Sequence, residues 1–554
     1  ATLVRRLSLD LTGVPPSIAA IDAFVEDRAP GAYARLVDRL LASPQYGEHM
    51  ARQWLDLARY ADTNGYERDH IRDIWAWRDW VIHALNDDLP FDRFTIEQLA
   101  GDLLPNATAS QIIATGFHRN SMLNRENGID VEEFRVAAVK DRVETTGVAW
   151  LGLSIGCAQC HDHKFDPITQ EDYYRLYAVF NQDAEELRVQ DINGDRSFRS
   201  DVSPRVAASP SATTLVMRRA SQPRDTHIQV RGNFLTKGKL VTPGVPSCFQ
   251  QLRDGVTADR LALARWLVDP DHPRTSRVVV NRLWAHHFGR GIVETLEDLG
   301  TQSPWPTHPQ LLDLLATELV HRDWSVKAMH RLMVTSATYR QSSYREPDKQ
   351  LKDPRNELLS SFPRQRLSAE QIRDNALAIG GLLSHKMGGP GVFPHQPKIQ
   401  SGFHGASWDE SQGEDRYRRA IYTFWRRTAP YASFVTFDAP TRDICSARRI
   451  ATNTALGALD LLNDPVFVDA ARGLAGRMIA DGGRETDQRI AHGFRLCVGR
   501  VSRADEVAAL RKLYNQAVGS YGRDAKAADQ LSNSGMPASE KDIDHDELAA
   551  WILV

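Results

Sequence analysis

The stretch IDVEEFRVAAVKDRVETTGVAWLGLSIGCAQCH, residues 129–161, decides the fold of this chain. Its first part, Ile129 to Leu153, repeats apolar residues at three-to-four spacing and therefore predicts the longest helix of the chain. The charged residues of this segment predict a helix face toward solvent; they are Glu132, Glu133, Lys140, Asp141, Arg142 and Glu144. The helix leads almost directly into Cys157-Ala158-Gln159-Cys160-His161.

These last five residues have the CxxCH spacing by which a haem of c type is attached to a polypeptide. Two residues between the thiols let one tight turn present both sulfurs to the same edge of a porphyrin, and the next residue projects beneath the ring. We therefore predict haem c, attached through Cys157 and Cys160, with His161 as the proximal iron ligand. Since such attachment takes place outside the cytoplasm, we expect an exported protein of the periplasm or cell envelope.

Three other chemistries compete for the same motif. A redox dithiol of the thioredoxin kind would follow a strand, whereas a helix is predicted here, and a structural disulfide is also open. His163 could act as an alternative metal ligand, because Cys157, Cys160, His161 and His163 would then supply four donors.

The second axial ligand of the iron would decide the activity, since a filled position makes an electron carrier and an open one admits a small molecule. The candidates by residue type are His118, His163, His286, His287, Met122 and Met333. We rank His118 first as the distal ligand, because it sits between a predicted helix end and a polar loop, whereas His163 is too near His161 in sequence.

Composition sets wider bounds. A length of 554 residues predicts two to four domains, and 42% hydrophobic with 25% charged residues is typical of globular proteins. The net charge of −3 argues against a nucleic-acid partner, and no apolar run reaches the length of a transmembrane segment. The chain opens with Ala1, so we expect an export signal upstream. Cys248, Cys445 and Cys497 allow at most one disulfide.

Apolar periodicity predicts helix after helix, and hence a mainly α, multi-helical fold. The exception is a small β segment near residues 226–246, where Thr226 to Gly232 alternates apolar and polar residues. We divide the chain into residues 1–182, a helical domain with the CxxCH motif, 183–250, a linker with the β segment, and 251–554, a helical C-terminal domain.

Several longer motifs resemble a known family. Leu7 to Pro16, Trp54 to Asp62, Gln98 to Asp102, Gly116 to Asn120 and Cys157 to Ile168 are similar to the planctomycete cytochrome c-like family of unknown function. Val280 to Gly291, Thr335 to Ser342, Phe437 to Pro440, Thr452 to Thr454 and Leu461 to Pro465 resemble its customary partner domain, also of unknown function. The resemblance covers nearly the whole chain. It implies an exported bacterial protein associated with polysaccharide breakdown, with a redox partner or an upstream cytochrome domain.

Carboxylates form a second group of candidates. Asp62, Asp73 and Glu126 are candidates for the catalytic residues of a sugar cleft, in which one acid donates a proton and another stabilises or activates a nucleophile. The alternative is that these carboxylates cap the solvated ends of helices. Trp75 and Trp77 would stack on the sugar, although tryptophan on a helix is more often part of the core. Asp62-x-Asn64-Gly65 is similar to a calcium loop, which makes a calcium ion a further possible cofactor, but the other ligands lack EF-hand spacing.

Arg442, Arg448 and Arg449 form a third group. Guanidinium groups bind carboxylates or sulfate esters through paired hydrogen bonds, so these residues are candidates for binding an acidic polysaccharide. The alternative is an ion-pair network that holds the two halves of the chain together.

Three functions follow. The first, which we favour, is an exported c-type haem oxidoreductase or electron-transfer protein linked to polysaccharide breakdown. The second is a glycoside-cleaving enzyme that uses the carboxylates, with haem or another metal in a structural role. The third is a binding or scaffold protein of the envelope.

Overall fold

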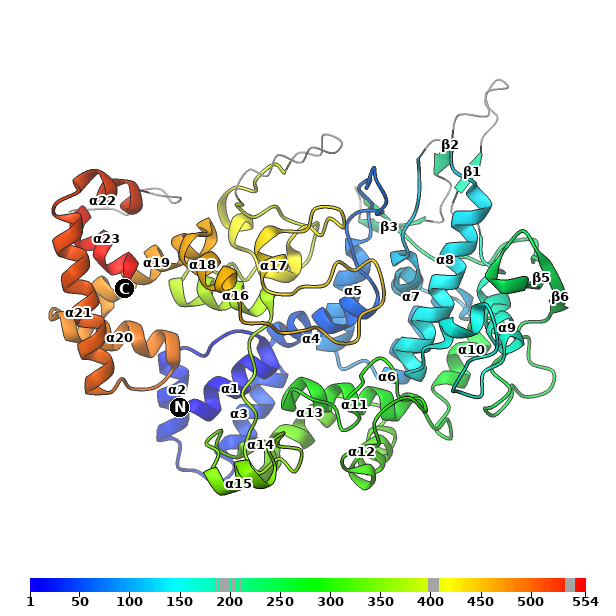
Figure 1. Ribbon diagram of the computed structural model, residues 1–554, viewed down its shortest axis with the longest axis horizontal. Coiled ribbons are helices and arrows are strands. Elements are labelled where there is room, and N and C mark those ends of the chain that lie inside the picture. Colours follow the sequence, from blue (N-terminus) through cyan, green and yellow to red (C-terminus); the bar gives the residue numbers. More distant parts are fainter. Residues whose placement is uncertain are drawn as a thin grey trace.

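The computed structural model describes residues 1–126, 128–184, 187–189, 199–201, 205–209, 212–396, 408–533 and 544–554. The described chain is mainly α-helical, as the sequence predicts. Its N-terminal part, blue to cyan in Figure 1, comprises α1 (Thr2–Thr12), α2 (Ile18–Glu26), α3 (Ala32–Leu41), α4 (Pro44–Leu57), α5 (Trp75–Asn86), α6 (Phe91–Ala100), α7 (Ala109–Ala114), α8 (Val131–Thr146) and α9 (Gln170–Phe180).

Local signals explain where these helices begin and end. Ser43 accepts a hydrogen bond from the Gln45 amide and precedes Pro44, so α4 begins at the proline. Thr169 forms a capping box with Asp172 at the start of α9. Gly13 ends α1 with a φ of 73°, a left-handed conformation that glycine adopts without strain.

The long helix predicted for Ile129 to Leu153 is shorter in the structure. α8 ends at Thr146, and a π-helical turn, η3 (Gly147–Leu151), follows before Gly152 turns the chain with a φ of 55°. The predicted solvent face is wrong for Arg142, which is only 3% exposed. Its buried guanidinium donates through Nε to the backbone oxygen of His118 at 3.4 Å. Burial lowers the pKa of Arg142 to about 9.

The described strands form three two-stranded antiparallel sheets: β1 (Leu187–Val189) with β2 (Arg199–Asp201), β3 (Arg205–Ser209) with β4 (Ala212–Leu215), and β5 (Thr226–Gln229) with β6 (Lys237–Val241). The last pair confirms the predicted β segment. The predicted linker also contains β1 to β4, while much of 185–211 lies outside the described residues.

The C-terminal part, green to red in Figure 1, is again helical. It comprises α10 (Arg260–Leu267), α11 (Thr275–Phe288), α12 (Pro309–His321), α13 (Val326–Thr335), α14 (Ala337–Arg340), α15 (Pro347–Lys352), α16 (Ala369–Gly380), α17 (Ala432–Thr436), α18 (Ala455–Asn463), α19 (Pro465–Asp481), α20 (Thr486–Val498), α21 (Ala504–Tyr521), α22 (Ala525–Ser532) and α23 (His545–Leu553). Among the described helices, none has the length and apolar character to cross a membrane.

The two halves of the chain share one hydrophobic core. Buried Leu7, Trp77 and Trp150 from the N-terminal half belong to the same cluster as Val280 and Met329 from the C-terminal half. α3 packs on α13, and α6 packs on α10. Because the halves interlock in this way, side chains distant in sequence meet in a cleft between them.

Candidate functional site

The CxxCH motif begins on a 3-10 turn, η4 (Ile155–Gln159), and Cys160 and His161 follow directly after it at the surface. Cys157 and Cys160 are both exposed free thiols. The exposed His161 ring places Nδ1 at 2.7 Å from the backbone oxygen of Asp162. Since a carbonyl only accepts, Nδ1 carries the proton and Nε2 keeps its lone pair for a ligand.

Helix α9 bonds to this turn, and the loop at Gly232 packs against it. The Tyr174 hydroxyl of α9 donates to the backbone oxygen of Gln159 over 3.1 Å. Lys140 of α8 donates to the backbone oxygen of Gly232 over 2.9 Å, and Gly232 lies so close to the motif that an added Cβ would stand 2.7 Å from the Cys160 sulfur. The two thiols are therefore presented outward from a supported turn.

His163 does not share this arrangement. Its Nδ1 accepts from the backbone amide of Asp166 at 2.8 Å and from that of Phe165 at 3.3 Å, so Nε2 bears the proton and neither nitrogen offers a free lone pair. Over the part of the chain that the structure describes, no group of three or more His, Cys, Asp or Glu side chains is placed to hold a metal ion. The four-ligand alternative and the calcium loop thus gain no support.

His118, the predicted distal ligand, is fully buried. Its ring contacts Phe117, Trp150 and Phe180, and its Nε2 lies 3.4 Å from the Thr146 hydroxyl. Burial, reinforced by nearby arginines, holds the pKa of His118 well below its usual range, so the ring is neutral. These contacts place it in the packing of α8 and α9.

The predicted carboxylates are engaged separately. Asp62 is buried and accepts from the Tyr60 hydroxyl and the Trp425 amide, Glu126 accepts from the backbone of Glu67 and Arg68, and exposed Asp73 lies 3.6 Å from Arg205. Trp77 is fully buried between Tyr60 and Phe117, and Trp75 is half-buried. The wall of the large cleft includes none of the five predicted residues Asp62, Asp73, Glu126, Trp75 and Trp77.

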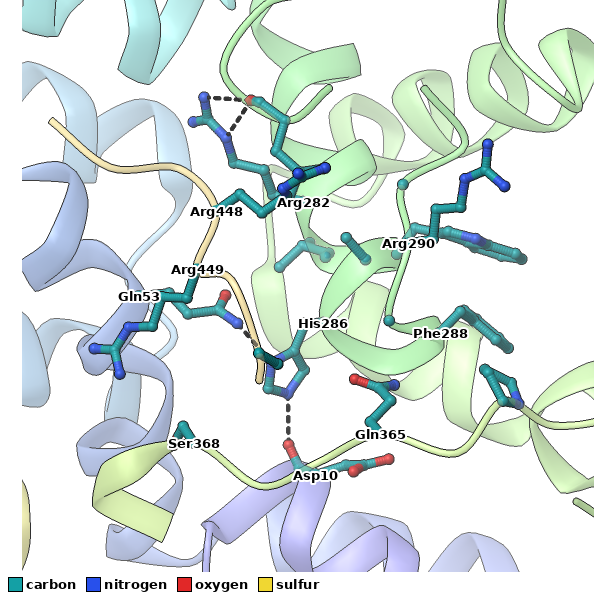
Figure 2. A pocket seen from close by; sticks show the side chains of 18 of the residues that line it. Asp10, Gln53, Arg282, His286, Phe288, Arg290, Gln365, Ser368, Arg448 and Arg449 are labelled. Carbon is teal, nitrogen blue, oxygen red and sulfur yellow. Dashed lines mark hydrogen bonds between the residues drawn. The ribbon is translucent and has the colours of Figure 1, made fainter. Parts of the chain in front are cut away.

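That cleft has a volume of about 1460 Å³. Figure 2 shows that its walls come from distant parts of the chain: Asp10 from α1, Gln53 from α4, His286 from α11, and Ser368 and Arg448 from later segments. Eleven arginines line it, against five carboxylates. The cleft is therefore a basic site at the junction of the two halves, and apolar side chains line it between the charged ones.

One corner of the cleft holds an ion-pair network. Arg449 binds Asp56 at 2.6 Å and Glu370 at 2.7 Å, and Arg442 binds Asp56 at 3.0 Å while it stacks on Trp425. Arg448 is exposed on the cleft wall and makes no hydrogen bond or ion pair with any described residue. The structure thus places two of the predicted arginines in a link between the halves and the third against open space.

The family comparisons match these two halves. Residues 1–185 match PSCyt2, a protein family of unknown function (DUF1549), and residues 259–514 match PSD1, a protein family of unknown function (DUF1553). The chain carries both domains, as its motifs predict. No curated protein and no solved structure matches it.

The cleft lies where the PSCyt2 domain meets the PSD1 domain. Asp10 of PSCyt2 accepts a hydrogen bond from Tyr339 of PSD1 at 2.6 Å, and its backbone oxygen accepts from Nε2 of His286 at 2.7 Å. Gln53 donates to Nδ1 of the same ring. Burial raises the pKa of Asp10 to about 7, although Tyr339 and Arg6 oppose this, and burial lowers the pKa of His286 to about 4.

Two further histidines border this group. His49 of PSCyt2 and His330 of PSD1 are buried, and Nε2 of each has no hydrogen-bond partner among the described residues. Burial holds the pKa of both well below the usual value. Analysis of the sequence missed Asp10, His49 and His330 as site residues, although Asp10 lies within a quoted family motif.

Proposed function

We propose that this chain is an exported c-type haem protein that transfers electrons in polysaccharide breakdown. Cys157 and Cys160 would form the thioether bonds, and His161 would be the proximal ligand. The observation that carries the proposal is the free Nε2 of exposed His161, beside two unpaired exposed thiols on one turn. The donation from Nδ1 to a backbone carbonyl is the usual support of a metal-binding histidine.

The residues present fit the group. Bound haem would supply a one-electron couple whose potential depends on the axial ligands and on exposure to solvent. The chain would orient His161 through Asp162 and hold the turn through Tyr174 and Gln159. None of the three motif residues lines the large cleft, so the haem turn and the cleft are separate sites. The link to polysaccharides is supported by the family resemblance.

The test is expression in a periplasm with a c-type maturation system, followed by a pyridine haemochrome assay after acid-acetone extraction. We expect the haem to stay with the protein in wild type and in Cys248→Ala, a matched exposed cysteine, and to be lost in Cys157→Ala together with Cys160→Ala. A colourless wild-type protein would overturn the haem proposal. A haem without reversible reduction would overturn the electron-transfer role.

A further inference from the structure

We propose that the cleft between the PSCyt2 and PSD1 domains binds an extended acidic oligosaccharide, a chain of sugar units that carries carboxylate or sulfate groups. The inference rests on the size of the cleft, on its uncompensated guanidinium groups and on the hydrogen-bonding side chains between them. It is independent of whether Cys157 and Cys160 carry haem.

Size is the first argument. Pockets for small ligands and cofactors have volumes of about 300–1,000 Å³. The volume of this cleft, about 1460 Å³, exceeds that range. A ligand that filled it would therefore comprise several linked units.

Charge is the second argument. Five of the lining arginines have no carboxylate within ion-pair distance among the described residues. Three of them, Arg5, Arg6 and Arg282, donate to backbone carbonyls, which satisfy hydrogen bonds without neutralising the charge. Arg364 and Arg448 are exposed and make no hydrogen bond or ion pair with a described residue. The remaining six form ion pairs: Arg52, Arg290, Arg355, Arg366, Arg449 and Arg500.

The lining carboxylates do not cancel this charge. Asp56, Glu294, Glu357 and Asp438 are all engaged by arginines. Asp10 is the fifth, and burial raises its pKa to about 7, so that it is partly protonated at neutral pH. The walls thus favour an anionic ligand, and the planar guanidinium matches carboxylate and sulfate geometry.

The uncharged polar side chains of the wall indicate what the ligand carries besides its acidic groups. Amides and hydroxyls lie among the arginines; they are Thr2, Gln53, Thr307, Ser343, Asn356, Gln365, Ser368, Gln371, Ser446 and Asn453. Such groups donate to and accept from sugar hydroxyls. The aromatic rings of the wall are packed inward: Phe91, Phe94, Trp284, Phe288, Phe362 and Phe437 are each less than 10% exposed, and Trp54 packs on Phe91, Phe94 and Trp150. Base stacking, on which binding of single-stranded nucleic acids depends, has little ring surface here. Recognition therefore falls to the guanidinium groups and the hydrogen-bonding side chains, which suit an acidic ligand rich in hydroxyl groups.

The test is calorimetric titration of the chain with oligogalacturonate, a sulfated galactan oligosaccharide, a neutral cello-oligosaccharide, polyglutamate and a single-stranded oligodeoxynucleotide. We expect binding of the uronate chain, the sulfated chain or both. Binding of one alone assigns carboxylate or sulfate as the recognised group. Arg364→Ala and Arg448→Ala should each weaken binding about tenfold or more, since each removes a charge-assisted hydrogen bond.

Arg265→Ala is the matched control, because Arg265 is exposed on α10 outside the cleft, and its affinity should equal that of wild type. Equal binding of the neutral chain, the peptide or the DNA would overturn the proposal, as would failure of both acidic chains to bind. Wild-type affinity in both cleft variants would also overturn it. The titrations are repeated with Cys157→Ala together with Cys160→Ala, so loss of haem and loss of glycan binding are read separately.

Discussion

The Tyr339 hydroxyl donates to Oδ2 of Asp10 at 2.6 Å and thereby joins α14 of the PSD1 domain to α1 of the PSCyt2 domain. Burial raises the pKa of Asp10 from an ordinary value of 3.8 to about 7, against the lowering influence of Tyr339 and Arg6. A carboxyl group that titrates near neutral pH thus lies on the wall of the cleft, where it can donate a proton or a hydrogen bond.

Asp10→Asn should stabilise the protein in a pH-dependent way. Between about pH 4 and 7 the unfolded chain releases the Asp10 proton while the folded protein keeps it, so the free energy of unfolding of wild type falls as pH rises through this window. Asn does not titrate, so above pH 7 the free energy of unfolding of Asp10→Asn should exceed that of wild type by up to roughly 4 kcal/mol. Urea unfolding from pH 4 to 8 measures the difference. Asp271→Asn, at an exposed position, should show no such trend.

Secondary structure was predictable where the sequence pattern is local. The β segment predicted near residues 226–246 is present as β5 and β6, and the cytochrome-like and partner motifs identify both domains. Apolar periodicity predicted a helix that runs past the end of α8. The pattern carries no information on the close packing of Gly147 against Ile155 or on the left-handed turn at Gly152. Charge alone also predicted an exposed Arg142, whereas the folded chain buries this residue and brings the His118 carbonyl, 24 residues away in sequence, within reach of its Nε.

The CxxCH turn and the cleft differ in how far they could be predicted, because one is local in sequence and the other is not. The CxxCH turn lies within five residues, so its thiols and imidazole could be named from the sequence. The cleft could not, because Asp10 and Tyr339 are 329 residues apart and meet only through packing of the two domains. The arginine motif showed that Arg442, Arg448 and Arg449 lie together, but not which of them faces carboxylates.

Removal of charge should affect stability strongly at Arg449 and hardly at all at its neighbour Arg448. Arg449→Met leaves Asp56 and Glu370 buried with one fewer cation, and we expect a loss of about 3–5 kcal/mol in the free energy of unfolding. Arg448→Met, at an exposed position without a described partner, should change it by less than about 0.5 kcal/mol. Chemical unfolding at pH 7 measures both.

The loss of unfolding free energy in Arg449→Met should be smaller at acidic pH. Burial alone would raise the pKa of Glu370, but Arg449 and Arg52 hold it well below its usual value of 4.5. The ion pair therefore stabilises the fold above about pH 4.5 and loses this effect as pH falls and Glu370 is protonated. Equal stability of Arg448→Met and Arg449→Met at pH 7 would contradict the network.

His161→Ala should separate haem attachment from iron ligation. The thioether bonds depend on Cys157 and Cys160, so matured protein should keep covalent haem in reduced yield, while loss of the proximal imidazole should change the Soret and visible bands of the reduced form. His321→Ala, at the exposed end of α12, is the matched control and should have the wild-type spectrum. An unchanged spectrum in His161→Ala would rule out His161 as the iron ligand.

Gly232→Ala should disturb the haem turn from a neighbouring loop. Gly232 has a φ of 75°, and an added Cβ would meet the Cys160 sulfur at 2.7 Å and Nε2 of Gln159 at 3.0 Å. Gly255→Ala introduces the same left-handed strain, at a φ of 78°, with nothing within 4 Å of the new Cβ. Both variants should lose about 1 kcal/mol or more of stability, but only Gly232→Ala should displace Cys160 and lower the yield of covalent haem. The ratio of haem absorbance to protein absorbance measures that yield, and equal ratios in the two variants would show that this loop does not position the motif.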